Sequence, residues 1–193
     1  MTPVEPKWKS LIVETVTPVF SPAQCQDIIN MGESLKKEQA QVGTSQPEGK
    51  QDTEKRITTI SWIPFKKLPE MYQILETLVH RTNGNHFGFD GIQLAEPAQY
   101  THYPVGGFYG WHTDNDVMGK NEPPVRKISM TLLLSSPNEF EGGDLELMDQ
   151  GKSAKLKQGQ AVFFASFIPH RVIPVTRGER KSLVMWFGGP SFR

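Results

Sequence analysis

Three residues of metal-ligand type stand at a spacing that would let them hold one ion: His112, Asp114 and, 56 residues further on, His170. Side chains at positions i and i+2 of an extended strand point to the same face, so we expect His112 and Asp114 to lie together on a strand over 108–114. A histidine from elsewhere in the fold would complete a set of two imidazoles and one carboxylate. That set leaves coordination positions open and is typical of non-haem iron(II) sites that use oxygen.

The histidine–X–aspartate triplet is a weak signal alone, because it also describes a surface histidine beside a solvated aspartate. The surroundings of His170 add weight to the metal hypothesis. It lies in the apolar, β-rich stretch 163–175, where burial of an imidazole without a partner is costly. A hydrogen-bonded core histidine fits the same stretch, but the three residues together favour metal ligation.

Two further residues could bind an acidic co-substrate near the metal. Arg180 precedes the apolar strand 181–187, and a guanidinium can make two parallel hydrogen bonds to a carboxylate. If strands 169–175 and 181–187 pair through the turn between them, Arg180 approaches the metal. Tyr103 would offer a phenol donor to the same carboxylate. Alternatively, Arg180 is a solvated turn residue and Tyr103 a core aromatic residue with its hydroxyl at the surface.

Composition excludes several classes of protein. The 193 residues suit one domain, and 21 basic residues balance 21 acidic ones, so a dominant electrostatic interaction with nucleic acid is not expected. Cys25 is the single cysteine, which excludes an intrachain disulfide framework and fits a reducing compartment. The charged segment 1–10 does not resemble a signal peptide, and no apolar run is long enough to span a membrane. We therefore expect a cytoplasmic protein.

Helical signals are confined to the first part of the chain. Ser21 followed by Pro22 is typical of a helix start, and we expect that helix over about 22–39. Apolar residues at helical spacing predict a second helix over about 69–81. A short strand that enters a turn is expected within 11–20, and a further strand at 56–63. After residue 87, turns rich in glycine and proline separate short strands at 92–103, 108–114, 127–135, 144–148, 161–165, 169–175 and 181–187.

Many short strands with such turns predict a mainly β protein with flanking α-helices, either a sandwich or a jelly roll. One domain is expected over 1–193, with N-terminal helical support over about 1–86 that buttresses a core over about 87–193. Two segments could close over a substrate, the polar loop 41–55 and the loop 115–124 after Asp114. Both could equally be inert surface connections.

Several ordered sequence blocks resemble the prolyl 4-hydroxylase-like 2-oxoglutarate/Fe(II) dioxygenases, and most closely the subgroup of PKHD-type hydroxylases. The resemblance covers roughly residues 92–190. The blocks are YPVGGFYGWHTD (103–114), RKISMTLLL (126–134), FEGGDL (140–145), PHRV (169–172) and GER (178–180). The resemblance implies a double-stranded β-helix, the cupin-like form of the jelly roll.

The same resemblance implies roles for individual residues. His112, Asp114 and His170 would be the iron ligands. Arg180 and Tyr103 would bind the distal carboxylate of 2-oxoglutarate, which makes Arg180 part of the catalytic set.

Two further positions match the family less specifically, and a third departs from it. Trp186 matches a tryptophan that lines the pocket, although core packing explains it equally well. Arg126 matches an arginine that meets a peptide substrate, although a solvated strand start is at least as good an explanation. Leu145 stands where these enzymes often have threonine, which would leave more of the carboxylate binding to Arg180 and Tyr103.

The activity implied by the resemblance is hydroxylation of a prolyl residue in a protein or peptide. It would use Fe(II), 2-oxoglutarate and O2, with ascorbate as an accessory reductant, and release succinate and CO2. Three alternatives stay open: hydroxylation of a free amino acid or other small molecule, oxidative demethylation of nucleic acid, and a non-catalytic jelly-roll binding module. The lack of a basic stripe argues against nucleic acid. Fold likeness alone is poor support for any substrate.

Overall fold

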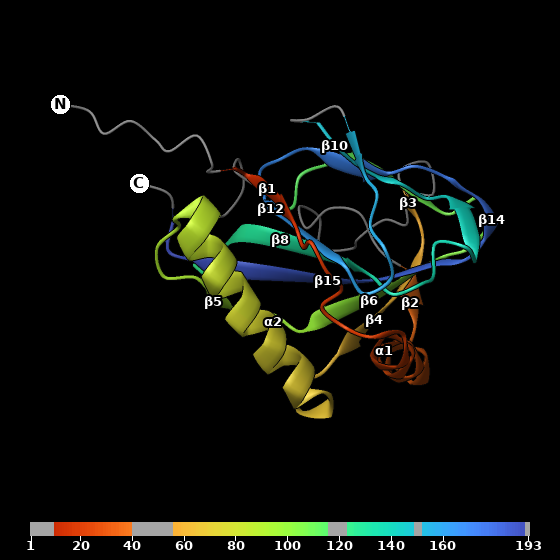
Figure 1. Cartoon of the computed structure of the whole chain (residues 1–193), viewed down its shortest axis with the longest axis horizontal. Helices are drawn as coiled ribbons and strands as arrows, with labels where there is room; N and C mark the ends of the chain where they lie inside the picture. The colour runs from red at the N-terminus through yellow and green to blue at the C-terminus, as the bar shows by residue number, and fades with distance from the viewer. Residues whose placement is uncertain (1–9, 40–55, 116–122, 149–151, 192–193) are drawn as a thin grey trace.

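Two antiparallel β-sheets face one another in the computed structural model, and two helices cover the outer face of the larger sheet (Figure 1). The structure describes residues 10–39, 56–115, 123–148 and 152–191. The expected loop 41–55, most of 115–124 and the charged segment before Ser10 therefore lie outside the described residues. Within the described part, no helix is long and apolar enough to cross a membrane.

The larger sheet is the one that the two helices cover. Its strand order is β1-β12-β8-β15-β6-β4-β2, and β5 pairs with β15 off this path. The strands are β1 (Ile12–Glu14), β2 (Glu38–Gln39), β4 (Thr59–Ile63), β5 (Gln93–Leu94), β6 (Ala98–Tyr103), β8 (Val125–Leu133), β12 (Ala161–Ala165) and β15 (Arg180–Gly189).

The smaller sheet has the order β11-β10-β13-β7-β3, and a separate two-stranded ribbon pairs β14 with β9. The strands are β3 (Arg56–Ile57), β7 (Phe108–His112), β9 (Phe140–Gly142), β10 (Leu145–Leu147), β11 (Lys152–Ala154), β13 (His170–Val172) and β14 (Val175–Gly178). The segment Arg56–Ile63 crosses between the two sheets, because β3 pairs with β7 and β4 pairs with β6.

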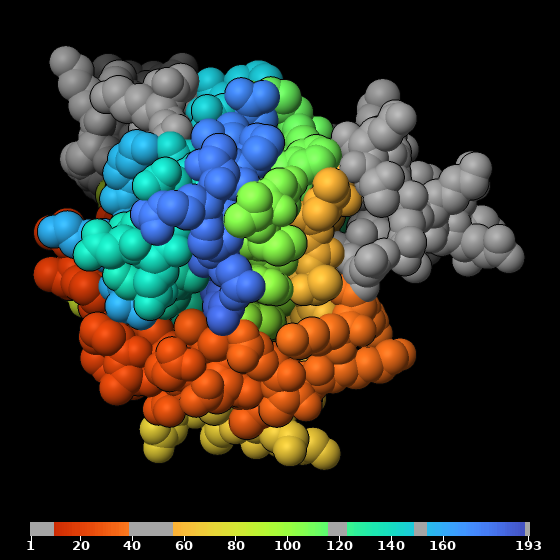
Figure 2. Space-filling view, turned by 90° about the vertical axis from the view of Figure 1, so that its right-hand side faces the viewer, coloured from red at the N-terminus to blue at the C-terminus, as the bar shows by residue number. Residues whose placement is uncertain are grey.

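Figure 2 shows the edge at which this crossing takes place. The segments that contain β3 and β4 (yellow-orange), β6 and β7 (green) and β14 and β15 (blue) lie side by side there, above α1 (red to orange). Strands from the N-terminal and C-terminal parts of the chain therefore meet at one edge of the sandwich.

Helix α1 (Pro22–Ser34) starts as its sequence predicts. Ser21 Oγ accepts from the Gln24 backbone N–H, the Gln24 side chain accepts from the Ser21 backbone N–H, and Pro22 occupies the first helical position. The predicted end near residue 39 is wrong, because the helix stops at Ser34 and the following residues Glu38–Gln39 pair with β4. Strand pairing here outweighs the helix propensity of Lys36 and Lys37.

Helix α2 (Pro69–Thr82) matches its predicted range, and its apolar side faces the larger sheet. A short 3₁₀ turn (Phe65–Lys67) precedes it and a π-helical turn (Asn83–Phe87) follows. The chain then leaves the helix through Gly88, which has a left-handed backbone (φ 71°).

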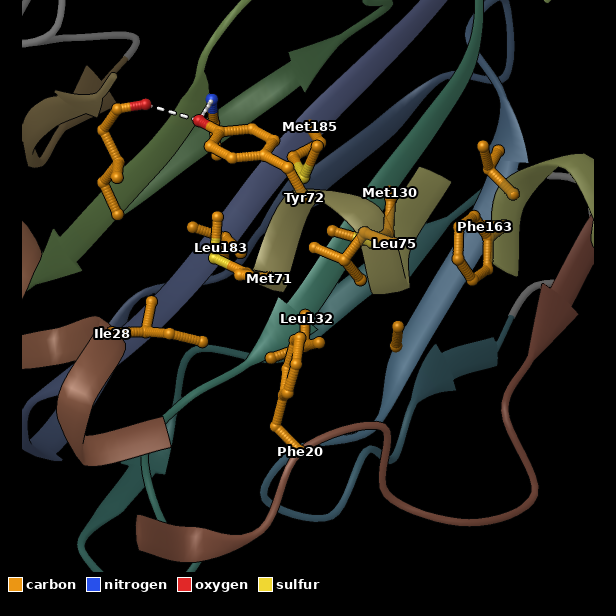
Figure 3. Close-up of a cluster of buried hydrophobic side chains, with 14 of the residues drawn as sticks. Phe20, Ile28, Met71, Tyr72, Leu75, Met130, Leu132, Phe163, Leu183 and Met185 are labelled. Atoms are coloured by element: carbon orange, nitrogen blue, oxygen red, sulfur yellow. Dashed lines mark hydrogen bonds between the residues drawn. The ribbon is translucent and has the colours of Figure 1, made fainter. Parts of the chain in front are cut away.

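One apolar cluster lies between the helices and the larger sheet (Figure 3). Residues from both helices meet alternate residues of β8, β12 and β15. Figure 3 labels Phe20, Ile28, Met71, Tyr72, Leu75, Met130, Leu132, Phe163, Leu183 and Met185. The Tyr72 hydroxyl, buried among them, donates to the Ile63 carbonyl and accepts from the Ala98 backbone N–H at 2.7 Å. This contact ties α2 to β4 and β6.

A second apolar cluster fills one end of the space between the two sheets. Its members include Leu133, Leu145, Leu147, Val162, Phe164 and Val172. These residues alternate along their strands with those of the first cluster or with solvated ones, as expected for a sandwich. Several other inward positions of β6, β8 and β15 are polar, among them Thr101, Ser129 and Ser182.

The mainly β jelly-roll prediction with buttressing helices is confirmed. One predicted pairing is wrong: 169–175 and 181–187 do not form a hairpin. The strand β13 pairs with β10 and β7 in the smaller sheet, whereas β15 pairs with β6 and β8 in the larger one. The segment between them contains β14, which pairs with β9, and carries the chain from one sheet to the other. The short strand expected within 11–20 is β1, which pairs with β12 over Ile12–Glu14.

Candidate metal centre

His112 and His170 are direct partners across two antiparallel strands. His112 is the last residue of β7 and His170 the first of β13, and their ring centroids lie 4.1 Å apart. Strand β7 contains one extra residue between the pairs His170–His112 and Val172–Tyr109. This bulge places Tyr109 and His112 on the same face, where their rings stack at 3.5 Å.

Asp114 lies just beyond the end of β7, so the prediction of a strand through residue 114 is wrong. The chain turns because the backbone N–H groups of Asp114 and Asn115 both donate to the Ser166 carbonyl, at 2.9 and 3.1 Å. This turn still carries the carboxylate to the imidazoles. His112 Nε2 lies 3.6 Å from Asp114 Oδ1, and His170 Nε2 lies 3.5 Å from Asp114 Oδ2.

Backbone carbonyls orient both imidazoles. His112 Nδ1 lies 2.8 Å from the Gly110 oxygen and His170 Nδ1 lies 2.9 Å from the Ile168 oxygen. A carbonyl oxygen only accepts, so each Nδ1 carries the proton and each Nε2 presents a lone pair. Both lone pairs therefore face the Asp114 carboxylate in the form that a metal ion requires.

The electrostatics of the cluster keep His112 and Asp114 in their metal-binding forms. Burial lowers the pKa of His112 to about 4, and the neighbouring His170 acts in the same direction. Burial acts to raise the pKa of Asp114, but His170 and His112 outweigh it and the net shift is downward. At neutral pH, His112 is thus neutral and Asp114 ionised.

The larger sheet supports Asp114 from the opposite side. Ser129 and Trp186 are register partners on β8 and β15, and both lower the pKa of the Asp114 carboxyl. Ser129 Oγ lies 3.0 Å from Ser166 Oγ. The Trp186 indole Nε1 is buried and has no hydrogen-bond partner at normal distance among the described residues.

His112, Asp114 and His170 are the group that fits a metal within the described part of the chain. Each offers one ligand atom, and these atoms lie within 4.8 Å of one another. Two neutral imidazoles and one carboxylate suit iron(II), and three protein ligands leave positions for other groups.

Arg180 is a buried cation without a carboxylate partner within 4.0 Å among the described residues. It is 3% exposed, its Nη1 donates to Ser182 Oγ at 2.9 Å, and its guanidinium lies 5.4 Å from the centre of the Tyr103 ring. Tyr103 is its register partner on β6. Burial lowers the pKa of Arg180, but an arginine still keeps its charge at neutral pH. A buried charge of this kind favours an anionic ligand.

There is room for such a ligand beside Arg180. Arg180 lines a cavity of about 440 Å³ together with Leu133, Gly143 and Leu145, among others. Leu145 brings an apolar side chain to this cavity, in keeping with the departure noted in the sequence. The three candidate metal ligands do not line the cavity.

Arg126 and Trp186, the two weaker predictions, lie against each other. The Arg126 guanidinium is 3.9 Å from the centre of the Trp186 ring system, and it forms two 2.6 Å hydrogen bonds to the Glu96 carboxylate. The Trp186 ring lies 6.0 Å from that of Trp62. Arg126 is thus already neutralised by Glu96.

Arg56 and Tyr109 are neighbours of the centre that the sequence did not reveal. The Arg56 guanidinium lies 4.3 Å from the centre of the Tyr109 ring, which in turn stacks on His112. Tyr109 falls inside the block 103–114, so its spacing from His112 could have indicated it. Arg56 has no such signal, because it reaches the centre only through the pairing of β3 with β7.

Part of the chain matches the model of a known protein family. Residues 98–188 match the model of the 2OG-Fe(II) oxygenase superfamily. This range contains β6, the candidate ligands His112, Asp114 and His170, and also Arg180 and Trp186.

Curated relatives match over a similar stretch. A PKHD-type hydroxylase of Hyphomonas neptunium is 45% identical over 84 residues, which cover 42% of this chain and 38% of the relative. A PKHD-type hydroxylase of Shewanella oneidensis is 40% identical over 93 residues, which cover 47% of this chain and 42% of the relative. The match thus spans about two fifths of the length of these curated relatives.

Solved structures share the fold over nearly the whole chain. A viral collagen prolyl hydroxylase from Paramecium bursaria Chlorella virus-1 superposes with a TM-score of 0.72 at 19% identity, covering 93% of this chain and 97% of that one. A Pseudomonas putida prolyl-4-hydroxylase gives 0.61 at 23% identity, covering 94% of each chain. Together with the metal-ligand geometry, these findings show that the segment 98–188 is similar to the 2OG-Fe(II) oxygenase superfamily and that the chain has the fold of these solved structures.

Proposed function

We propose that this protein is a 2-oxoglutarate- and Fe(II)-dependent dioxygenase that hydroxylates a prolyl residue in a protein or peptide. The observation that carries the proposal is the convergence of two Nε2 lone pairs and one carboxylate at His112, Asp114 and His170. When bound there, iron(II) with 2-oxoglutarate and O2 supplies an oxidant that converts a C–H bond to C–OH, with release of succinate and CO2.

The residues of the chain position the reactants and exclude water. His112, Asp114 and His170 would hold the iron, while the Gly110 and Ile168 carbonyls keep both Nδ1 protons away from it. Arg180, with Tyr103 beside it, would bind the distal carboxylate of 2-oxoglutarate. The buried surroundings of Arg180 strengthen that ion pair, because little water competes for the guanidinium.

The prolyl part of the proposal has independent support from the names of similar proteins. The matched relatives are PKHD-type hydroxylases, and two fold neighbours are prolyl hydroxylases. A third, from Trichoplax adhaerens, was solved with a hypoxia-inducible-factor peptide fragment. We extend this substrate class to the present chain, together with ascorbate as an accessory reductant and a cytoplasmic location.

The first test is conversion of 2-oxoglutarate to succinate in the presence of Fe(II), O2 and proline-containing peptides. We expect the wild type to turn over and to add one oxygen atom to a proline, read as a mass gain. His112→Ala should lose turnover because one ligand is missing. His80→Ala is the matched control, since His80 is an exposed residue of α2 and belongs to neither sheet. His80→Ala should retain full activity.

Arg180→Ala tests the second part of the site. It should raise the 2-oxoglutarate concentration needed for half-maximal rate by about tenfold or more, the equivalent of one charge-assisted interaction. Arg177→Ala removes an exposed arginine of β14, paired with Glu141, and should leave that concentration unchanged. A wild type that makes no succinate with any peptide would contradict the proposal.

A further inference from the structure

Arg56 reaches into the space between the two sheets at the edge where the chain crosses from β3 to β4. Its backbone pairs with Tyr109 of the smaller sheet, while its Nη2 donates to Gln99 Oε1 on the larger sheet at 3.4 Å. Thr58, two residues later, donates to the His102 carbonyl at 2.8 Å and fixes the crossing. The side chain of Arg56 therefore bridges the two sheets.

The Arg56 guanidinium lies close to the candidate metal centre. The guanidinium covers the Tyr109 ring at 4.3 Å, and that ring covers His112 at 3.5 Å. One aromatic ring thus separates the cation from an imidazole that would hold the metal.

The charge of Arg56 is not neutralised within the described part of the chain. No carboxylate oxygen there lies within 4.0 Å of it, and the contact with Gln99 is long and uncharged. Its Nε is buried without a hydrogen-bond partner. A half-buried guanidinium that has no carboxylate partner and one buried donor unpaired is a poor structural element, because its desolvation is only partly offset. It is better suited to bind an anion that arrives later.

A count of formal charges gives the sign of the missing partner. Asp114 and Arg180 cancel each other, as do Arg126 and Glu96. On the proposed function, the two positive charges of iron(II) are balanced by the two carboxylates of 2-oxoglutarate. Arg56 then leaves the loaded centre with one excess positive charge, which a substrate with one negative charge would neutralise.

From these observations we propose that Arg56 is a specificity-determining residue that binds a carboxylate of the substrate, so that acidic substrates are preferred. The inference rests on the proposed function and adds the substrate class. The carboxylate has two sources: an acidic side chain next to the target residue in a peptide, or the α-carboxylate of a free amino acid or chain end.

Matched probes separate these sources. The first pair is the blocked tripeptides Gly-Pro-Glu and Gly-Pro-Gln, the second Glu-Pro-Gly and Gln-Pro-Gly, and the third L-proline and L-prolinamide. Their affinities are measured calorimetrically on the protein loaded with Mn(II) and 2-oxoglutarate, so no turnover is needed. At least one acid member should bind about tenfold or more tightly than its amide partner, and the pair that shows this identifies the source.

Three variants test whether Arg56 causes the preference. Arg56→Gln should bring acid and amide probes to equal affinity, Arg56→Lys should keep part of the preference, and Arg56→Glu should reverse it towards a Lys-bearing tripeptide. Arg81→Gln removes an exposed arginine of α2 and should change nothing. Thermal unfolding of each variant checks that it is folded, and Arg56→Lys keeps the test valid if Arg56→Glu does not fold.

Two results would overturn the role of Arg56. One is equal affinity of the wild type for acid and amide probes, or affinity for neither. The other is a preference that survives in Arg56→Gln. Failure of the wild type to bind Mn(II) and 2-oxoglutarate would instead contradict the proposed function, so the two failures are distinguishable.

Discussion

At the scale of single residues, Gly143 controls how Arg180 can lie. Its backbone is left-handed (φ 64°), and a Cβ there would come within 2.9 Å of both Arg180 Cδ and Val175 Cγ2. Gly106 has a similar backbone (φ 80°), but a Cβ there would meet no atom within 4 Å. Substitutions at the two glycines can therefore distinguish the effect of backbone strain from the effect of displacing the Arg180 guanidinium.

We expect Gly143→Ala to raise the 2-oxoglutarate requirement severalfold, because the new methyl group pushes Arg180 away from the cavity. Gly106→Ala should cost stability of about 1 kcal/mol through strain alone, with no change in that requirement. The measurements are succinate formation against 2-oxoglutarate concentration and thermal unfolding of both variants. An equal effect of the two substitutions on the requirement would contradict this reading of Gly143.

Not all of the site could be predicted at the residue scale. His112, Asp114 and His170 stand in short, recognisable sequence patterns, so their proximity could be predicted. The structure brings them together. Arg56 and Trp62 belong to no such pattern. Arg56 pairs with Tyr109 of β7 and Trp62 with Gln99 of β6, 53 and 37 positions further along the chain. Long-range pairing of this kind leaves no local signal.

At the scale of elements, a small ionic network joins α1 to the larger sheet. Glu33 lies 2.9 Å from Lys181 Nζ on β15 and accepts from the Tyr100 hydroxyl of β6 at 3.2 Å. The hydrogen bond from Lys181 lowers the pKa of Glu33 below its ordinary 4.5. Because the folded pKa is lowered, the stabilisation is present above pH 4.5 and is lost as the pH falls through the lowered value.

Glu33→Gln should therefore lower the free energy of unfolding at pH 7 by a few tenths to about 1 kcal/mol, since the pair is partly exposed. The difference from the wild type should shrink towards zero as the pH falls below 4.5. Glu38→Gln is the matched control, because its pair with Lys36 is 3.7 Å long and largely exposed. Urea unfolding at several pH values checks both variants, and a difference that grows in acid would contradict the sign.

Element boundaries show why the predicted fold was right and one connection wrong. The helix over 69–82 was predictable because its apolar positions recur at one period and its tertiary contacts use that same face. The connection from β13 to β15 could not be predicted, since a short glycine-containing segment is equally compatible with a hairpin and with a change of sheet. The pairing of β15 with β6 and β8 decided between them.

At the scale of the whole molecule, ligand binding should appear as stability. A metal ion and 2-oxoglutarate that bind only the native state stabilise it by about 2.7 kcal/mol at a hundred times their Kd. For a protein of this size that corresponds to a rise in Tm of about 5–10 °C. Mn(II) with 2-oxoglutarate should produce this rise in the wild type and in His80→Ala.

Asp114→Ala should show no metal-dependent rise, because the carboxylate is the one anionic ligand of the cluster. Thermal unfolding with and without Mn(II), and after treatment with a chelator, gives the comparison. A full rise in Asp114→Ala would place the metal at some other site.

The cross-strand position of His112 and His170 has a consequence for the living cell. All three candidate ligands come from β7, β13 and the turn after β7, whereas the helices and the larger sheet share a separate apolar cluster. An ion at this centre would stabilise the pairing of β7 with β13 directly, and would act on the larger sheet less directly, through the contacts of Ser129 and Trp186 with Asp114. Shortage of iron would then loosen the smaller sheet first and expose it to proteases, so that the amount of this protein would follow the iron supply.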